Sequence, residues 1–227
     1  MARDLFLVAF ALFLWGVGEG AFIFFQPLYL QQLGASSIHI GAILGASGIA
    51  MTIAHIPAGH LADRVGRRPL LWASWFLGMA ATWVMALGSS LPVFVAGLLL
   101  YGLTSFVMAP LSSYLTAARG KWSVGRVLTL ISAGYNAGAI LGPLLGGWIG
   151  DRLGLRQVYP FGASLFVIST LVILFIRPQP IESLPREESQ NGLPLTKRYL
   201  GYLGIVFLAM FAIMLPQPLS ANYLQNE

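Results

Sequence analysis

Long apolar stretches alternate with short polar segments along the chain, and this pattern predicts membrane-spanning helices. A helix needs about 20 consecutive apolar residues to cross the hydrocarbon core of a bilayer. Seven stretches are about that long, at residues 5–29, 38–61, 69–87, 92–117, 125–149, 158–176 and 199–219. We therefore expect an all-α membrane protein that crosses the bilayer several times.

The longest polar segment separates six of these stretches from the seventh. Residues 177–198 read RPQPIESLPREESQNGLPLTKR, a composition that cannot bury enough apolar surface to form a core. We expect a six-helix transmembrane bundle at residues 1–177, a cytoplasmic linker at 178–198, and a seventh helix within 199–227.

Two short segments are alike on either side of this linker. Residues 26–32 read QPLYLQQ and residues 217–225 read QPLSANYLQ, each at the end of an apolar run. Internal repeats of this kind are typical of carriers built from two related halves. On that interpretation residues 199–227 begin a second half, although the shared composition of membrane helices explains the likeness equally well.

Composition excludes a water-soluble domain. Hydrophobic residues make up 57% of the chain and charged residues 9%, against about 25% charged residues in soluble domains. The net charge is +5, but the basic residues are scattered among short segments rather than gathered in a stripe. We therefore expect the lipid bilayer as a partner, and no nucleic acid.

The basic residues also predict how the chain lies in the membrane. Lys and Arg near span ends are retained on the cytoplasmic side. With a cytoplasmic N-terminus, eleven of the 13 basic residues lie in inner segments and only Arg152 and Arg156 in outer ones. The inner ones are Arg3, Arg64, Arg67, Arg68, Arg119, Lys121, Arg126, Arg177, Arg186, Lys197 and Arg198. We expect a multi-pass protein of the cell (plasma or inner) membrane with its N-terminus in the cytoplasm.

Cofactor and metal chemistry find little support in the sequence. The chain has no cysteine, which excludes disulfides and thiolate ligands. The histidines, His39, His55 and His60, have no carboxylate beside them in a ligand-like spacing. We expect no cofactor, no metal site and no enzymatic activity, since Glu19 is the only acid deep within a span.

One short segment between the second and third stretches carries a dense set of charges and glycines. It reads GHLADRVGRR, and its distinctive residues are Gly59, Asp63, Arg64, Gly66, Arg67 and Arg68. Gly59 lets the second helix approach a neighbour closely, and Gly66 permits a positive φ in a tight turn. The arginines can bind carboxylates or exposed helix carbonyls, so this segment could act as a cytoplasmic gate. The alternative explanation is that the arginines only keep this segment on the cytoplasmic side of the membrane. It accounts for the arginines but not for the glycines or the aspartate.

The spacing G-x-x-x-D-R-x-G-R-R, placed after the second span, resembles the cytoplasmic loop signature of the major facilitator superfamily (MFS). This resemblance covers nearly the whole chain and implies the N-terminal six-helix half of a twelve-helix carrier, plus the first helix of the second half. In such carriers two halves rock around a site near the midplane. One departure is that the inner end of the fourth span, SSYLTAARG, lacks the acid that pairs with the second arginine in many relatives.

The fifth stretch contains GYNAGAILGPLLGG, whose glycines recur every four residues. They lie on one helical face, where small residues allow close helix packing. The segment resembles the fifth-helix signature G-x-x-x-G-P-x-x-G-G, which in the superfamily is associated with proton-exchanging exporters. The residues expected to pack or bend this helix are Gly134, Gly138, Gly142, Pro143, Gly146 and Gly147. The arginine that many exporters place four residues before a glycine of the fourth helix is absent, since Leu98 precedes Gly102 there.

Glu19 is a candidate site for protons or substrate, because a carboxylate inside the membrane is costly and is often functional. Burial disfavours its charged form, so Glu19 could take up and release a proton. Trp15, Glu19, Phe22 and Gln26 share one helical face that could line a cavity. A hydrogen bond to a neighbouring helix, or a bound cation, is an equally good explanation of Glu19.

Other polar side chains could meet a substrate or hydrogen-bond between helices. Tyr101, Ser105, Met108 and Ser112 share a face of the fourth span, and Ser132 shares one with Asn136 on the fifth. With Trp15, Glu19 and Gln26, we take Tyr101, Ser105 and Asn136 as the candidate proton or substrate site.

These features predict secondary active transport of a small solute by alternating access, with proton-coupled efflux of an amphipathic compound as the leading function. Two alternatives remain: uptake of a sugar, organic acid or metabolite by the same fold, and a half-carrier that serves only as an assembly subunit. The expected partners are a small-molecule substrate, protons and a C-terminal six-helix half.

The orientation can be tested directly because the chain has no native cysteine. With single substitutions Arg67→Cys and Lys121→Cys, we expect a membrane-impermeant thiol reagent to label both positions from the cytoplasmic face only. Arg156→Cys should be labelled from the opposite face. Labelling of Arg67→Cys and Lys121→Cys from opposite faces would contradict the predicted topology.

Overall fold

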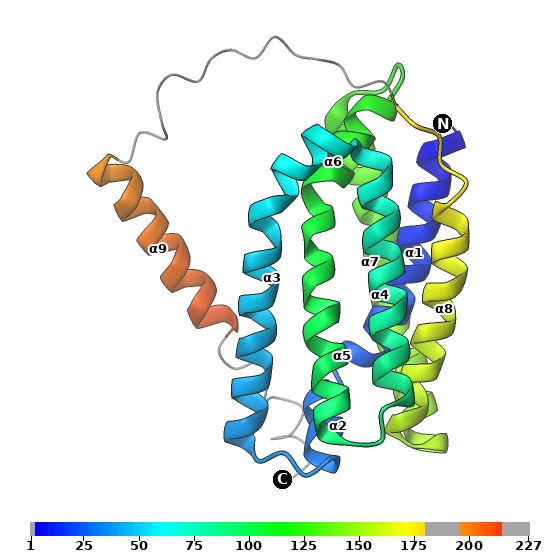
Figure 1. The fold of residues 1–227 in the computed structure, drawn as a ribbon, viewed down its shortest axis with the longest axis vertical. Helices are drawn as coiled ribbons and strands as arrows, with labels where there is room; N and C mark the ends of the chain where they lie inside the picture. Colours follow the sequence, from blue (N-terminus) through cyan, green and yellow to red (C-terminus); the bar gives the residue numbers. More distant parts are fainter. Residues whose placement is uncertain (1–2, 180–195, 215–227) are drawn as a thin grey trace. The chain divides into compact units, whose positions relative to one another are not determined.

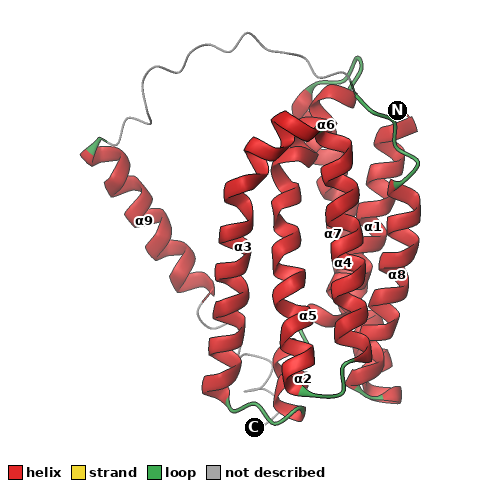
Figure 2. Ribbon diagram, viewed as in Figure 1, coloured by secondary structure: helices red, strands yellow, loops and turns green. Residues whose placement is uncertain are grey.

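The computed structural model describes residues 3–179 and 196–214, and describes only the backbone at 56–64, 197–198 and 213–214 (Figure 1). The described residues form helices and no strands (Figure 2). The chain divides into two compact units, Met1–Pro180 and Ile181–Glu227. The first unit contains eight α-helices among its described residues, and the second contains α9 (Lys197–Met214).

Six helices of the described residues are long and apolar enough to cross a bilayer. They are Arg3–Ile23 (α1), Ser37–His55 within α3 (Ser37–Val65), Arg67–Leu87 (α4), Leu91–Ala118, Val124–Leu153 (α7) and Leu155–Ile173. The last of these spans comprises the short 3₁₀ segment η2 (Leu155–Gln157) and α8 (Val158–Ile173). The predicted seventh span continues past the described part of α9, so it stays a prediction.

The prediction of one continuous first helix at residues 5–29 was wrong. The chain turns at Phe24 and Phe25 and starts a second helix, α2 (Gln26–Gln32), with Pro27 in its first turn. Proline suits a first helical turn because it lacks a backbone N–H to donate, whereas inside a helix it breaks a hydrogen bond. Pro27 was the signal for this break.

The fourth span also differs from a simple helix. It consists of α5 (Leu91–Leu103), the 3₁₀ segment η1 (Thr104–Val107) and α6 (Met108–Ala118). Pro110 has no N–H to donate to Phe106 four residues earlier, and the chain tightens over the turn that precedes it. Ser74 of α4 donates a hydrogen bond of 3.0 Å to the Thr104 carbonyl, which stabilises this irregular turn.

Successive spans run in opposite directions, so the connections gather at two ends of the first unit (Figure 1). The start of α1, the α3–α4 and α6–α7 connections and the segment after α8 lie at one end. The α2–α3, α4–α5 and α7–α8 connections lie at the other. Arg152, in the last turn of α7, and Arg156, in η2, therefore lie away from Arg67 at the start of α4.

The tightest packing in the unit is between α1 and α7, whose backbones meet through glycines. A Cβ atom placed on Gly142 would lie 2.6 Å from the Val17 oxygen and 2.7 Å from the Ala21 nitrogen. Cβ atoms on Gly138 and Gly146 would collide with the carbonyl oxygens of Phe13 and Ala21. Lipid supplies no hydrophobic force between helices, so close backbone contact of this kind is a main source of cohesion.

A set of hydrogen bonds ties the segment after α8 to the rest of the unit. Asp4 of α1 accepts a hydrogen bond of 3.0 Å from the Arg177 backbone N–H. The Tyr114 hydroxyl of α6 donates one of 2.8 Å to the Arg177 carbonyl. Both backbone groups of Arg177 are thus satisfied by side chains, and the chain leaves the unit from a fixed point.

We expect Gly142→Ala to destabilise the bundle by about 1–3 kcal/mol, the usual cost of overpacking a tight contact. The added methyl group must push the α1 and α7 backbones apart. Gly147→Ala is the matched control, because a Cβ there would meet only the Phe25 ring at an ordinary 3.6 Å. Thermal unfolding of the detergent-purified variants measures both changes, and equal melting temperatures would contradict the packing account.

We expect Tyr114→Phe to cost about 0.5–1.5 kcal/mol, because it removes the hydrogen bond to Arg177 and keeps the buried ring. Tyr202→Phe makes the same chemical change on an exposed ring of α9 and should have no comparable effect. Amide hydrogen exchange of Arg177 and Gln179 should also rise in Tyr114→Phe. No difference between the two variants would show that this attachment is unimportant.

Candidate functional site

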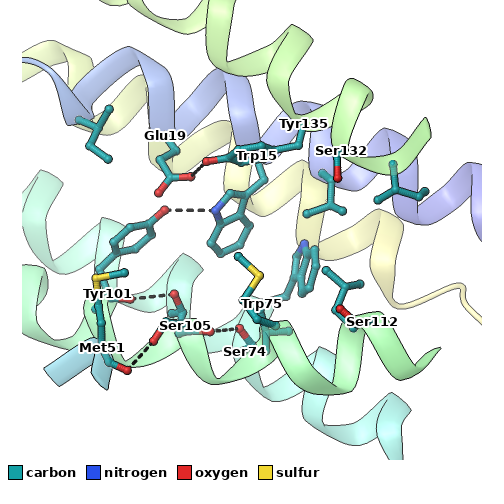
Figure 3. A pocket seen from close by; sticks show the side chains of 18 of the residues that line it. Trp15, Glu19, Met51, Ser74, Trp75, Tyr101, Ser105, Ser112, Ser132 and Tyr135 are labelled. Atoms are coloured by element: carbon teal, nitrogen blue, oxygen red, sulfur yellow. Dashed lines mark hydrogen bonds between the residues drawn. The ribbon is translucent and has the colours of Figure 1, made fainter. Parts of the chain in front are cut away.

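A cavity of about 490 Å³ lies within the first unit (Figure 3). Residues from α1 to α7 line it, so it is enclosed by five of the six spans. All six residues of the predicted proton or substrate site are among them: Trp15, Glu19, Gln26, Tyr101, Ser105 and Asn136. Its volume falls within the range of about 300–1,000 Å³ that is typical of small-molecule sites.

Glu19 of α1 accepts a hydrogen bond of 2.7 Å from the Tyr135 hydroxyl of α7. The Tyr101 hydroxyl of α5 faces the same carboxyl group and accepts a hydrogen bond of 3.1 Å from Trp15 Nε1 (Figure 3). Three spans therefore converge on one carboxyl group. The predicted hydrogen bond between Glu19 and a neighbouring helix is present, within a cavity that a solute could occupy.

Aromatic rings form the wall behind this carboxyl group. The Trp15 ring stacks on Phe166 of α8 at 4.0 Å between centroids and lies 5.4 Å from Trp75 of α4, edge to face. Glycine makes room for this arrangement, because a Cβ on Gly78 would collide with the Trp15 ring. The absence of a side chain at Gly78 of α4 therefore allows the Trp15 ring to take its place in the wall.

The smaller polar groups mostly bond to backbone carbonyls. Ser105 donates to the Met51 carbonyl of α3 at 3.0 Å, which links two spans. Asn136 donates to the Ser132 carbonyl at 2.8 Å within α7. Each of these side chains also lines the cavity, so hydrogen bonding within the bundle and contact with a solute are compatible roles.

The predicted face of α1 was wrong at Phe22. This ring is fully buried and is absent from the residues that line the cavity. It packs between helices, 5.6 Å from the Tyr159 ring and 5.7 Å from Tyr101. The spacing from Trp15 places Phe22 near the same face, but the neighbouring rings of α5 and α8 cover it.

Sequence reasoning missed Tyr135, Trp75 and Ser74. Tyr135 carried a signal, since it lies on one helical face with Ser132 and with Asn136, and Asn136 was chosen. Trp75 and Ser74 carried none, because nothing local indicates which face of α4 meets the cavity.

The glycines of α7 lie elsewhere. Gly134, Gly138, Gly142, Gly146 and Gly147 are absent from the cavity lining, and a Cβ atom on any of the first four would meet the α1 backbone. Pro143 lies inside α7, which continues as one helix through it.

The gate segment is more helical than the sequence indicated. Backbone helix α3 runs to Val65, so Gly59, Asp63 and Arg64 lie in its last turns rather than in a loop, and their side chains are outside the described residues. The turn consists of Gly66 alone, with φ of 88°, a conformation that favours glycine.

Two arginines follow this turn and bind differently. Arg67 Nη1 donates a hydrogen bond of 3.2 Å to the Ser113 carbonyl of α6. The Arg68 guanidinium lies 4.0 Å over the Trp72 ring. Arg67 thus reaches the end of the fourth span that lacks the expected acid, and there it binds a backbone carbonyl instead.

Metal binding has no visible basis in the part of the chain that the structure describes. No group of three or more His, Asp or Glu side chains comes together among those residues. Glu19 accepts a hydrogen bond from the Tyr135 hydroxyl.

Solved structures with the same arrangement of helices are transporters. A crystal structure of a peptide transporter, POT, aligns with a TM-score of 0.68 at 18% identity, over 95% of this chain and 47% of that one. A D-xylose–proton symporter aligns with a TM-score of 0.63 at 13% identity, over 93% of this chain and 52% of that one. At these identities the likeness shows the fold alone, and it confirms the predicted MFS-type bundle.

Relatives by sequence carry transporter names as well. Multidrug resistance protein MdtG of Citrobacter koseri is 30% identical over 192 residues, 82% of this chain and 47% of the relative. MdtG of Enterobacter lignolyticus is 33% identical over 184 residues, 78% and 44% of the two chains. An uncharacterized MFS-type transporter of Methanocaldococcus jannaschii is 25% identical over 173 residues, 76% and 45%. The chain spans about half the length of these curated relatives.

The family assignment covers nearly all of the sequence. Residues 8–225 match the family description Major Facilitator Superfamily. Together with the six apolar spans and the shared fold, this match confirms the resemblance first indicated by the segment between α3 and α4. The chain is a multi-pass membrane protein that belongs to the Major Facilitator Superfamily.

Proposed function

We propose that this chain forms the N-terminal half of a secondary active carrier that exports a small amphipathic solute in exchange for protons. The observation that carries this proposal is the cavity with Glu19 inside it, held by Tyr135 and faced by Tyr101. A carboxyl group inside the membrane is the side chain best suited to gain and lose a proton there. The cavity around it is large enough for a small organic molecule.

In this mechanism Glu19 carries the proton, and Trp15, Gln26, Tyr101, Ser105 and Asn136 contact the solute. A second six-helix half closes the cavity from the other side, and the two halves rock to expose it alternately. The name of the MdtG relatives, multidrug resistance protein, favours efflux. The chain spans about half the length of those relatives, so the activity of a whole carrier is part of this proposal.

The segment between α3 and α4 serves as the cytoplasmic gate. Arg67 joins α4 to α6 through the Ser113 carbonyl, and α6 also lines the cavity with Ser112 and Leu115. Loss of this contact would therefore move the α6 residues that line the cavity. With the N-terminus in the cytoplasm, the gate lies on the inner side of the membrane.

Uptake of a metabolite is a second candidate, because one structural neighbour is a D-xylose–proton symporter with the same fold. In uptake, Glu19 binds the substrate or a proton that travels with it. Measuring substrate-stimulated proton flux in sealed vesicles, with its direction, separates the two functions. Opposite movement of solute and protons supports exchange, and movement in the same direction supports uptake.

A half-carrier that serves only as an assembly subunit is a third candidate, because carriers of this type are built from two related six-helix halves and the described residues contain six apolar spans. Vesicles that contain this chain alone should then show no solute flux, and flux should appear when a matching C-terminal half is added. Flux by the chain alone would contradict this candidate.

We expect Glu19→Gln to abolish substrate-driven proton movement in vesicles that contain the assembled carrier, because an amide cannot exchange a proton near neutral pH. Asp151→Asn makes the same change on an exposed acid near the end of α7 and should leave coupling intact. Proton flux is followed with a pH-sensitive dye. Unaltered coupling in Glu19→Gln would remove Glu19 from the mechanism.

A further inference from the structure

The connection between α6 and α7, with the first turn of α7, carries three basic residues that we call the basic patch: Arg119, Lys121 and Arg126. It lies at the end of the first unit that also holds the start of α1 (Figure 1). Lys121 and Arg126 are exposed. The Arg126 guanidinium lies 5.6 Å from the centroid of the Trp122 ring, which packs against the core. This contact holds the guanidinium beside a fixed ring at the surface of the bundle.

No described acid neutralises the basic patch. Among the residues whose side chains the structure describes, the acids are Asp4, Glu19 and Asp151. Asp4 lies at the same end but is buried and accepts a hydrogen bond from the Arg177 N–H. Glu19 lines the cavity, and Asp151 lies near the end of α7, at the opposite end of the unit. The patch therefore complements an anion.

An exposed apolar face of α7 continues from the patch into the membrane-spanning part of the helix. Its members follow Arg126 at helical spacing and are all exposed: Leu130, Ala133, Ala137, Ile140 and Leu144. Half of the hydrocarbon core is about 15 Å deep, which corresponds to about ten residues of helix. An acyl chain that starts beside Arg126 therefore ends near Ala137. The short side chains of Ala133 and Ala137 let it lie against the helix.

We propose that the basic patch binds the headgroup of an anionic phospholipid, and that an acyl chain of this lipid lies along Leu130, Ala133 and Ala137. Phosphate oxygens accept strong hydrogen bonds from guanidinium and ammonium donors, and basic side chains beside membrane spans attract anionic lipid. The inference goes beyond the proposed function, because it concerns the surface of the first unit and requires no transport.

The opposite end of α7 supplies a matched comparison. Arg152 is exposed and lies 5.7 Å from the centroid of the exposed Trp148 ring, so each end of α7 has an arginine–tryptophan pair of the same kind. At that end Asp151 offsets part of the charge of Arg152 and Arg156. The two ends therefore differ in net charge and not in the cation–π contact. We expect selective lipid binding only at the basic patch.

The direct test compares phosphatidylglycerol with phosphatidylcholine of identical acyl chains. Native mass spectrometry of the purified full chain in detergent measures the dissociation constant of each lipid. One basic side chain near an anionic headgroup changes binding about fivefold, so we expect phosphatidylglycerol to bind at least about fivefold more tightly. Equal affinities would overturn the inference.

A double variant at the patch locates the site. Lys121→Gln with Arg126→Gln should weaken phosphatidylglycerol binding at least about fivefold and leave phosphatidylcholine binding unchanged. Arg152→Gln with Arg156→Gln removes the same charge at the opposite end and should leave both affinities unchanged. An equal loss in the two double variants would show that any two cations of the chain have this effect, and would overturn the site.

A second control lies at the same end as the patch. Arg177 is exposed there and follows α8, which packs mainly on α1 and α4 rather than on α7. Arg126→Gln alone should therefore reduce the preference for phosphatidylglycerol, whereas Arg177→Gln alone should keep it. Equal losses would show that the lipid responds only to the total charge of this end, which contradicts a site on α7.

The contribution of the acyl chain is tested separately. Inorganic phosphate carries the acceptor oxygens of the headgroup without an acyl chain, and burial of each CH₂ group adds to the affinity of a lipid. A large excess of inorganic phosphate should therefore fail to displace phosphatidylglycerol. Displacement would show that the patch binds a free anion and would overturn the lipid assignment.

Salt tests the electrostatic contribution on the unaltered chain, so the inference stays testable if a variant fails to fold. A lipid that binds the folded chain stabilises it, and at low salt phosphatidylglycerol should raise the melting temperature more than phosphatidylcholine does. About 1 M salt shortens the screening length to about 3 Å and should remove this difference. A difference that persists at high salt would contradict the role of the basic patch.

Discussion

The backbone contact between α1 and α7 is the constraint on which the candidate site depends. A Cβ on Gly20 would lie 2.9 Å from the Ala139 oxygen, and one on Gly16 would lie 3.1 Å from the Ala139 nitrogen. Glu19 and Tyr135 project from these same turns, and their hydrogen bond is 2.7 Å long. Short side chains at the contact thus bring two longer ones into register. A wider helix separation would leave the buried carboxyl group without its phenol partner, and an unpaired buried polar group is costly.

Glycines also make room for the aromatic rings that form the wall of the cavity. Gly78 of α4 admits the Trp15 ring, and Gly18 of α1 admits Phe166, whose ring would lie 2.7 Å from a Cβ there. The wall is therefore stiff, because interiors packed this closely have little room for alternative rotamers. A stiff wall fixes the direction of the Trp15 N–H, and through Tyr101 it fixes the hydrogen bonding at Glu19. The packing of the rings therefore also determines the hydrogen bonds at Glu19.

In the segment between α3 and α4 the structure explains a departure from the family pattern. The fourth span ends without the acid that pairs with the second arginine in many relatives, yet Arg67 still reaches it through the Ser113 carbonyl. A guanidinium uses the same N–H donors to bind a helix carbonyl as to bind a carboxylate. The hydrogen bond to the carbonyl is weaker, because the carbonyl is neutral. The weaker contact joins α4 to α6, and the Tyr114 bond to Arg177 holds α6 from another side.

Sequence alone determined the number of described spans, the family and six of the residues that line the cavity, because apolar length, glycine spacing and a buried acid are local signals. Glu19, Tyr101 and Asn136 could be chosen in this way, and Tyr135 was within reach through its shared face with Ser132. Breaks at Pro27 and Pro110 were readable in principle, since proline acts on its own helix. Only the tertiary structure decided that Phe22 is covered, that Trp75 and Ser74 face the cavity, and that Trp15 donates to Tyr101. Those facts depend on which helices pack against each other. The spacing of residues along one helix shows which of them share a face, but it does not show which other helix that face contacts.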